Sequence, residues 1–361
     1  MTTLTPTPGT VTGGVDTHAD LHVAAALNHL GGLLATAEFA TTAAGYRKLL
    51  AWLNSFGPLH QVGVEGTGSY GAGLARHLTA QGVTVVEVSR PNRELRRRLG
   101  KSDTIDAVAA ARAVLSGEAS ATPKTHDGPV EALRALKVVQ RSANKARTQA
   151  LNQIHALVLT APEELRERLR TLKTAALVKV CAGFRIAADD DSLTAIVRLA
   201  LRELAQRIGH LQVQLKTVVA RLHRITKNTA PALVAIHGVG PDVASTLLLT
   251  AGDNPHRLRN EAAFAALCGS SPLPATSGKR QNRHRLNQGG DRHANAALWR
   301  IAIVRLSHDQ RTKDYVAKRT TEGKNTGEIL RCLKRYIARE VFAALPHELL
   351  KTAAPQPAFL T

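Results

Sequence analysis

The first 118 residues alternate strand signals with helix signals, and this order limits the possible folds more than any other feature of the chain. Short apolar or alternating runs bounded by turn residues predict strands at 11–16, 22–28, 33–39, 61–65 and 83–88. Residues 41–56, 71–81 and 103–115 are predicted helices, and the first has Tyr46, Leu49, Leu50 and Leu53 on one face. The order predicts an α/β domain with a mixed sheet.

This order, βββαβαβα, is typical of an RNase H-like domain, although other α/β folds are compatible with it. Residues 127–230 are predicted to be helical throughout, with start signals at Asp127-Gly-Pro129 and at Thr160-Ala-Pro162. Asp189–Asp191 places acidic charge at the start of a long helix that ends near Thr229.

That long helix carries an apolar stripe with steps of three and four residues. Its members are Leu201, Leu204, Ile208, Leu211, Leu215, Val218 and Leu222. The stripe indicates a coiled-coil-like seam, and we expect it to meet a partner helix. The alternative is a single long helix that packs within its own domain.

Residues 231–345 form a third predicted region, with helices at 231–236, 241–250, 257–267 and from about 291 to 345, and a loop at 269–290. His237-Gly-Val-Gly240 resembles the turn of a helix-hairpin-helix, in which Gly238 and Gly240 let backbone N–H groups approach a phosphate. A plain helix–helix turn is the alternative. The predicted domains are therefore 11–125, 126–230 and 231–345, followed by a poorly ordered tail at 346–361.

The charge of the chain points to a polyanionic partner, most simply nucleic acid. Lys and Arg number 48 against 28 Asp and Glu, which gives a net charge of +20 and a pI of about 10.6. Residues 90–180 carry 18 basic and 9 acidic side chains, and 257–340 carry 18 and 7, whereas 1–89 carry 3 and 5. Aromatic residues are only 3% of the chain, which argues against base stacking as the main mode of recognition.

Several other classes of protein are disfavoured. The three cysteines lie far apart, which excludes a disulfide framework and a cysteine-based zinc site. The polar N-terminus does not look like a signal peptide, and no run of about 18 apolar residues could span a bilayer. We therefore expect a cytoplasmic protein that does not enter membranes.

Four carboxylates stand at positions that could converge. Asp16 ends the first predicted strand and Glu65 ends another, while Asp103 and Asp106 lie three residues apart on one helix face. Carboxylates held close together repel each other unless a cation lies between them, and oxygen ligands suit Mg²⁺ or Mn²⁺. Each acid alone could be a turn, cap or surface residue, but the set favours a metal site, which we expect to hold two ions.

A basic stripe precedes the paired aspartates: Arg90, Arg93, Arg96, Arg97, Arg98 and Lys101. It could hold a nucleic-acid backbone beside the metal site, and the alternative is a solvated helix face. A second basic cluster lies in the predicted loop at 269–290 and comprises Lys279, Arg280, Arg283 and Arg285. These side chains suit phosphate binding.

The chain resembles a known family through short segments that are specific in their order and spacing, from about residue 11 to 340. They are Gly14-Val-Asp-Thr-His18, Val64-Glu-Gly-Thr-Gly-Ser-Tyr70, Lys101-Ser-Asp-Thr-Ile-Asp-Ala107, Ile236-His-Gly-Val-Gly-Pro241, Leu267-Cys-Gly-Ser-Ser-Pro272 and Ala275-Thr-Ser-Gly278. The family is that of the DEDD-type insertion-sequence transposases of the IS110 group, which are bridge-RNA-guided serine recombinases.

The resemblance implies a RuvC-like domain whose Asp, Glu, Asp, Asp set falls on Asp16, Glu65, Asp103 and Asp106. It also implies a coiled-coil middle, a C-terminal transposase domain, and a nucleophilic serine that falls on Ser277. Ser270 and Ser271 are rival hydroxyls, because Gly269-Ser-Ser-Pro272 has a serine where the family usually has an apolar residue.

The implied activity is excision and insertion of a mobile element through metal-assisted attack of the serine on DNA, with a covalent phosphoserine intermediate. The implied partners are donor and target DNA, a structured guide RNA, and further copies of the chain in a dimer or tetramer that brings acids and serine together across subunits. The implied location is the bacterial nucleoid. The alternatives are a RuvC-type junction nuclease that uses water, and a nucleic-acid-binding protein without catalysis.

Overall fold

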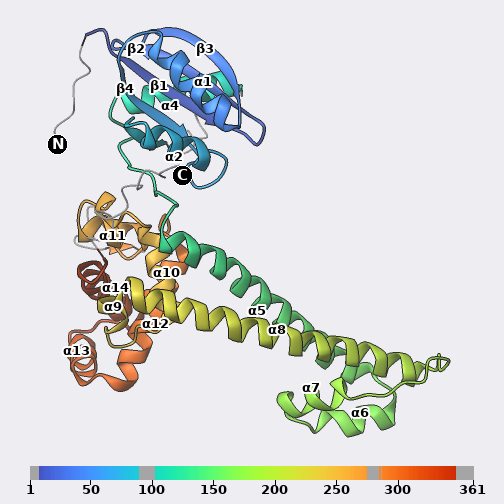
Figure 1. Ribbon diagram of the computed structural model, residues 1–361. Coiled ribbons are helices and arrows are strands. Elements are labelled where there is room, and N and C mark those ends of the chain that lie inside the picture. The colour runs from blue at the N-terminus through green and yellow to red at the C-terminus, as the bar shows by residue number, and fades with distance from the viewer. Residues whose placement is uncertain (1–7, 89–101, 275–283, 286, 347–361) are drawn as a thin grey trace, which may run out of the picture. The chain divides into compact units, whose positions relative to one another are not determined.

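The computed structural model describes residues 8–88, 102–274, 284–285 and 287–346. Two compact units are seen in the chain (Figure 1). The α/β unit contains residues 8–88, 102–128 and 251–260, and the helical unit contains the described parts of 129–250 and 261–346. The three predicted domains, 11–125, 126–230 and 231–345, stay a prediction about functional parts of the chain.

The α/β unit is built on a five-stranded mixed sheet in the order β3-β2-β1-β4-β5. The strands are β1 (Val11–Thr17), β2 (Leu21–Asn28), β3 (Leu33–Ala40), β4 (Leu59–Glu65) and β5 (Val85–Val88). Strands β1, β2 and β3 form an antiparallel meander, while β4 runs parallel to both β1 and β5. The five predicted strands and the α/β class are thus confirmed.

Helices cover both faces of this sheet. Helices α1 (Ala43–Asn54) and α2 (Ala72–Ala80) bury leucines such as Leu53 and Leu78 against the valines of β1 and β4. Helix α4 (Asp103–Leu115) packs on β1, β2, β4 and β5 from the opposite face, where Val86, Val88 and Val114 form a smaller core. Because helices cover both faces, the residues of β1 and β2 are buried almost throughout.

Two glycines let α4 lie unusually close to the sheet. A Cβ atom at Gly14 of β1 would lie 2.3 Å from the backbone of both Ala107 and Ala111, and one at Gly63 of β4 would lie 2.8 Å from Ala110 O. Real Cβ atoms do not approach backbone atoms so closely, so a side chain at either position forces the helix outward. The sequence thereby fixes the height of α4 above the strand ends.

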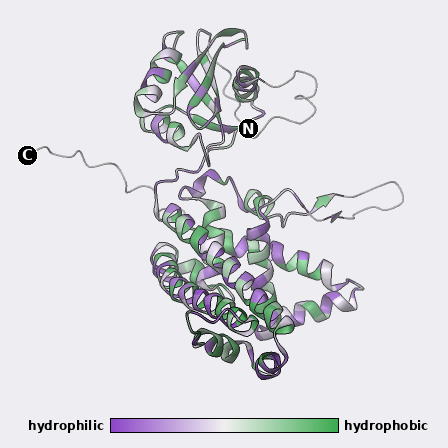
Figure 2. Cartoon of the chain, turned by 90° about the vertical axis from the view of Figure 1, so that its right-hand side faces the viewer, coloured by the Kyte–Doolittle hydropathy of each residue, from purple (hydrophilic) through white to green (hydrophobic). Residues whose placement is uncertain are grey.

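The helical unit contains a long antiparallel pair, α5 (Pro129–Thr160) and α8 (Leu193–Thr229), with α6 (Glu163–Arg170) and α7 (Thr174–Ala182) at one end (Figure 1). These helices carry both hydrophilic and hydrophobic residues (Figure 2). Of the predicted stripe on α8, Leu201, Ile208, Leu215, Val218 and Leu222 are buried within the chain itself. Helix α5 of the same chain packs along α8. The expectation that this stripe meets a partner helix from outside the domain is therefore wrong, and the alternative of packing within the domain holds.

The other end of the helical unit holds α9 (Pro231–Val234), α10 (Pro241–Ala251), α11 (Glu261–Leu267), α12 (Arg292–His308), α13 (Gln310–Thr321) and α14 (Thr326–Ala343). A two-stranded ladder of β6 (Leu273–Pro274) and β7 (His284–Arg285) lies within the predicted loop at 269–290. Among the helices that the structure describes, none combines the length and apolarity needed to cross a membrane.

The helix predicted at 257–267 begins later than expected, at Glu261. A short 3₁₀ turn, Pro255–Arg257, precedes it, and the Arg257 side chain bonds Ala251 O at 3.0 Å. Residues 251–260 belong to the α/β unit, where Asn254 Nδ2 donates to Pro123 O at 2.8 Å and Arg259 Nη2 donates to Ser120 Oγ at 3.0 Å. Of the tail predicted at 346–361, residues 347–361 lie outside the described part of the chain.

Candidate active site

Asp16 and Glu65 stand side by side at one edge of the sheet. Strands β1 and β4 are parallel, and Val15 pairs with Val64, so the next residue of each strand is a carboxylate. Thr17 Oγ1 donates to Glu65 O at 2.9 Å and ties the two strand ends together. Side chains alternate along a strand, so Asp16 and Glu65 lie on the face of Gly14 and Gly63, which is the face that α4 covers. Two predicted ligands are therefore neighbours.

Helix α4 brings the other two acids to the same edge. Ser102 caps the helix, its Oγ accepting from Ile105 N at 3.4 Å, so Asp103 and Asp106 fall in the first turn. Asp106 is buried at 5% exposure, whereas the Asp103 side chain is half exposed. The positive end of the helix dipole favours negative charge at both positions. Close packing of α4 on Gly14 holds this first turn near the strand ends.

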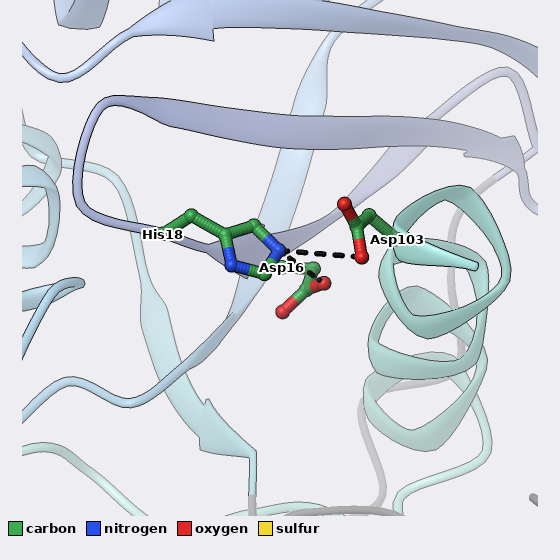
Figure 3. Close-up of side chains that lie close together, drawn as sticks. All are labelled: Asp16, His18 and Asp103. Atoms are coloured by element: carbon green, nitrogen blue, oxygen red, sulfur yellow. Dashed lines mark hydrogen bonds and ion pairs between the residues drawn. The ribbon is translucent and has the colours of Figure 1, made fainter. Parts of the chain in front are cut away.

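His18 joins two of the acids and was not predicted to have a role (Figure 3). Its Nε2 lies 3.1 Å from Asp16 Oδ2 and 3.4 Å from Asp103 Oδ1. One ligand atom from each of these three residues lies within 4.8 Å of the other two. The signal in the sequence was the Asp-Thr-His spacing, because residues two apart on extended chain point to the same side.

Electrostatics in the α/β unit show the same convergence. Burial raises the pKa of Asp16, and the negative charges of Asp106 and Asp103 raise it further, while His18 opposes the shift. Asp103 and Asp106 therefore both act on Asp16, and Glu65 adjoins Asp16 along the strand edge. A divalent cation would remove this repulsion, so the donor set fits Mg²⁺ or Mn²⁺. An imidazole nitrogen suits Mn²⁺ better than Mg²⁺.

Most of the predicted nucleic-acid-binding residues lie outside the described part of the chain. These are Arg90, Arg93, Arg96, Arg97, Arg98, Lys101, Lys279, Arg280 and Arg283, and the predicted nucleophile Ser277 lies outside it as well. Arg285 is described and is exposed on β7. The roles of all these residues stay predictions.

The two rival serines have hydroxyl groups that are already engaged. Ser270 is buried at 9% exposure, and its Oγ donates to Ala265 O at 3.1 Å. Ser271 Oγ accepts from Asn287 Nδ2 at 3.1 Å. A hydroxyl that is buried and donates to a carbonyl is poorly placed to attack DNA, which counts against Ser270 more than against Ser271.

The predicted glycine turn is present between α9 and α10. Val239 N donates to Ile236 O at 2.9 Å, and Gly238 has a φ of +86°, which favours glycine. A Cβ at Gly238 would approach Ile301 at 3.2 Å, whereas one at Gly240 would meet open space. The first turn of α10 also carries Asp242, a carboxylate that disfavours a phosphate at that helix end. Backbone conformation and packing against Ile301 explain the glycine at 238 without a ligand. Contact of Gly240 with a nucleic-acid phosphate stays a prediction.

Comparisons with known proteins agree on one class. A family model for transposases of the DEDD type from the IS110 group matches residues 13–161. A second model, described as transposase IS116/IS110/IS902 family, matches residues 230–317. The first match contains all four acids, and the second contains Ser277.

Two curated proteins are similar to the chain. A transposase for insertion sequence element IS1328 from Yersinia enterocolitica is 27% identical over 283 residues, which are 78% of each chain. An uncharacterized 43.6 kDa protein of insertion element IS110 from Streptomyces coelicolor is 24% identical over 154 residues, which cover 42% of this chain and 38% of that protein.

Proposed function

The chain belongs to the IS110 family of insertion-sequence transposases, and we propose that it excises and inserts an insertion sequence by phosphoryl transfer on DNA. The observation that carries the proposal is the meeting of Asp16 and Asp103 around His18, with Glu65 on the adjoining strand end and Asp106 acting on Asp16. We propose that this α/β unit is a RuvC-like domain of the RNase H fold class. Its strand and helix order supports that reading.

Asp16, Glu65, Asp103 and Asp106 would hold the metal, which we propose to be two Mg²⁺ or Mn²⁺ ions. Bound ions of this kind neutralise phosphate charge and lower the pKa of an attacking hydroxyl. His18 positions Asp16 and Asp103 from its place between their carboxylates. The close packing of α4 on Gly14 and Gly63 keeps Asp106 buried beside the strand ends.

Ser277 is the proposed nucleophile. Its Oγ gives up a proton and forms a bond to the scissile phosphorus, while the bond from phosphorus to a deoxyribose oxygen breaks and that oxygen takes up a proton. One phosphodiester replaces another, so the bond energy is retained for rejoining a new strand. The basic residues around the serine, Lys279, Arg280, Arg283 and Arg285, would hold the phosphates of the DNA.

We further propose that a structured guide RNA selects the DNA sites and that the stripe from Arg90 to Lys101, with Gly238 and Gly240, contacts nucleic-acid backbones. The low aromatic content supports a protein that reads backbone and shape while base pairing reads sequence.

We propose that the acids and the serine meet across the subunits of a dimer or tetramer. The assembly would act in the cytoplasm of a bacterium, on its nucleoid. Packing of α5 on α8 leaves the assembly surface unassigned.

The test uses labelled target DNA, guide RNA and Mg²⁺ with the wild-type chain, followed by denaturation and a search for DNA joined to protein. We expect a covalent adduct that is lost in Ser277→Ala and in Asp103→Ala. An adduct that survives Ser277→Ala contradicts the assignment of the serine. Cutting that needs metal and leaves no adduct indicates a nuclease that uses water, and no cutting by the wild type indicates a binding protein.

A further inference from the structure

The helical unit contains a cavity of about 590 Å³ that is rich in cationic side chains and is separate from the acidic site. Its walls come from α14 and from the chain on both sides of the β6–β7 ladder, including residues 269–272. The volume falls within the range of ligand pockets, about 300–1,000 Å³. Six cationic side chains and one carboxylate, that of Glu328, line it: Arg285, Lys324, Arg331, Lys334, Arg335 and Arg339.

The cations from α14 share one face of the helix. Lys334, Arg335 and Arg339 follow Arg331 by three, four and eight residues, which is the spacing of neighbours along an α-helix. Like charges at such spacing repel one another, so the arrangement destabilises the free helix. A counter-charge is therefore expected in the cavity.

Lys334 is the most costly of these charges. Only 7% of it is exposed, and its Nζ donates to Asn295 Oδ1 at 2.8 Å. Within the described part of the chain, no carboxylate lies within 4.0 Å of this ammonium group. Burial lowers the pKa of Lys334, and the charge of Arg331 lowers it further. A buried cation paired only with an amide oxygen is stabilised when an anion joins it.

Lys334 also connects the cavity to the turn at its wall. Asn295, which accepts from Lys334, donates through Nδ2 to Cys268 O and Gly269 O, both at 2.9 Å. This network fixes the turn that leads into the segment carrying Ser277. The cavity wall therefore includes the turn at 269–272, which precedes Ser277 in the sequence.

The neighbouring arginines are incompletely paired. Arg335 Nη2 and Arg339 Nε both donate to Glu261, at 3.1 and 2.7 Å, so two guanidinium groups share one carboxylate. Arg335 Nη1 is buried and has no hydrogen-bond partner among the described residues. Guanidinium groups present paired donors that match phosphate oxygens. The cavity therefore has excess positive charge, and one of the arginines that line it has an unfilled donor.

We propose that this cavity binds a backbone phosphate of the DNA strand on which the enzyme acts, with Lys334 and Arg331 as the principal contacts. The proposal rests on the proposed function for the identity of the strand, while phosphate binding itself does not depend on catalysis. It assigns α14 to DNA binding separately from the metal site of the α/β unit.

The test measures binding of the full chain, in EDTA, to duplex DNA and to RNA of equal length over a series of salt concentrations. Loss of one phosphate contact lowers the slope of log K against log salt by about 0.9, which is about eightfold in affinity at 0.1 M salt. We expect this loss for DNA in Arg331→Gln, an exposed position, and in Lys334→Gln. The matched control is Lys179→Gln on α7, also exposed, which should keep the wild-type slope.

A DNA slope and affinity for Arg331→Gln equal to those of Lys179→Gln would overturn the proposal, even if Lys334→Gln fails to fold. A loss confined to RNA would overturn the assignment to DNA. Because EDTA prevents chemistry, the slope is independent of the covalent adduct. If the wild type forms no adduct but Arg331→Gln still lowers the salt slope of DNA binding, the proposed function is contradicted and the phosphate site is not.

Discussion

The two units gather charges of opposite sign by different physical means. In the α/β unit, parallel strands and a capped helix place carboxylates at one edge, and glycines set the depth of the helix. In the helical unit, cations converge because α14 packs beside a turn that is distant in sequence, and Lys334 is buried with only an amide partner. The first arrangement is suited to a divalent cation and the second to a phosphate.

The sign of the charge at each site determines which ligand the site responds to. The carboxylate edge of the α/β unit should respond to metal, whereas the cavity of the helical unit should respond to salt and to polyanions. Substitutions that remove a charge in one unit should leave the response of the other unchanged.

Asp106→Asn should have the largest effect. Outer partners of metal ligands contribute about 10–100-fold to metal affinity or activity, so loss of a buried ligand should cost more than about a hundredfold in adduct formation. Binding of DNA in EDTA should stay within twofold or so of wild type, because the helical unit is untouched. Quantitative gels with Mn²⁺ or Mg²⁺ measure the first quantity and anisotropy titrations measure the second.

The matched control for that variant is Asp127→Asn, an exposed acid of the same unit, which should keep full adduct formation. Equal activity of Asp106→Asn and Asp127→Asn would show that the acidic edge has no part in the reaction. Removal of metal from the wild type should reproduce the Asp106→Asn result.

Gly14→Ala tests the close packing of α4 on β1. The new Cβ would meet the backbone of Ala107 and Ala111 at 2.3 Å, so we expect a destabilisation of about 1–3 kcal/mol and a loss of metal affinity. The same change at Gly209 of α8, where a Cβ meets nothing within 4 Å, should stabilise the helical unit by about 0.5–1 kcal/mol. Hydrogen exchange of peptides from each unit measures both changes. Unchanged protection in Gly14→Ala would refute the close contact.

Asp242→Asn tests a carboxylate of the helical unit whose charge is balanced by neighbouring cations. Asp242 accepts from the buried Lys137 and from Arg300, the latter at 2.7 Å. Burial opposes ionisation of Asp242, but these two cations outweigh it and lower the pKa of the carboxyl group. Since Asp242 is partly exposed, we expect the substitution to cost only about 1–2 kcal/mol.

The pH dependence of that cost has a definite sign. A lowered pKa of Asp242 stabilises the fold above the unfolded value of about 3.9, and the stabilisation is lost as the pH falls through the lower folded value. Burial lowers the pKa of Lys137 despite the pair, so the acid dependence should follow Asp242. Urea titrations at several pH values should show the difference from wild type shrinking in acid, whereas the exposed control Asp314→Asn should show none. A constant difference would contradict this.

His18→Gln should have the smallest effect. Its imidazole joins Asp16 to Asp103 without being one of the four acids, so we expect about a tenfold loss of metal affinity. Calorimetric titration with each ion measures it, with His29→Gln in the β2–β3 turn as the control. Equal affinities in His18→Gln and His29→Gln would show that His18 is a bystander.

The acidic edge could be predicted from the sequence because its causes are local. Strand periodicity placed Asp16 and Glu65 at strand ends, and the spacing of Asp103 and Asp106 needs only one helical turn. The Asp-Thr-His spacing placed His18 beside Asp16, but its contact with Asp103 joins segments that are far apart in the sequence, and His18 was missed for that reason. The helix expected from 257 begins at Glu261 because Pro255 starts a separate 3₁₀ turn.

Features of the helical unit that depend on tertiary contacts were harder to predict. A stripe with steps of three and four shows that α8 needs an apolar neighbour, but it does not show that α5 supplies it. Cations such as Arg331 and Lys334 resemble a solvated helix face until the turn at 269–272 is placed beside them. Burial of Lys334 could only be seen after folding brought Asn295 to its side.

In the proposed function, acids of the α/β unit and a serine of the helical unit serve one reaction. The most direct test is mass spectrometry of the adduct formed with DNA and Mg²⁺, after digestion of both protein and DNA. We expect a nucleotide phosphate on Ser277 in the wild type and none in Asp106→Asn. A phosphate on Ser271 or another residue, or equal modification of Ser277 in Asp106→Asn, would contradict it.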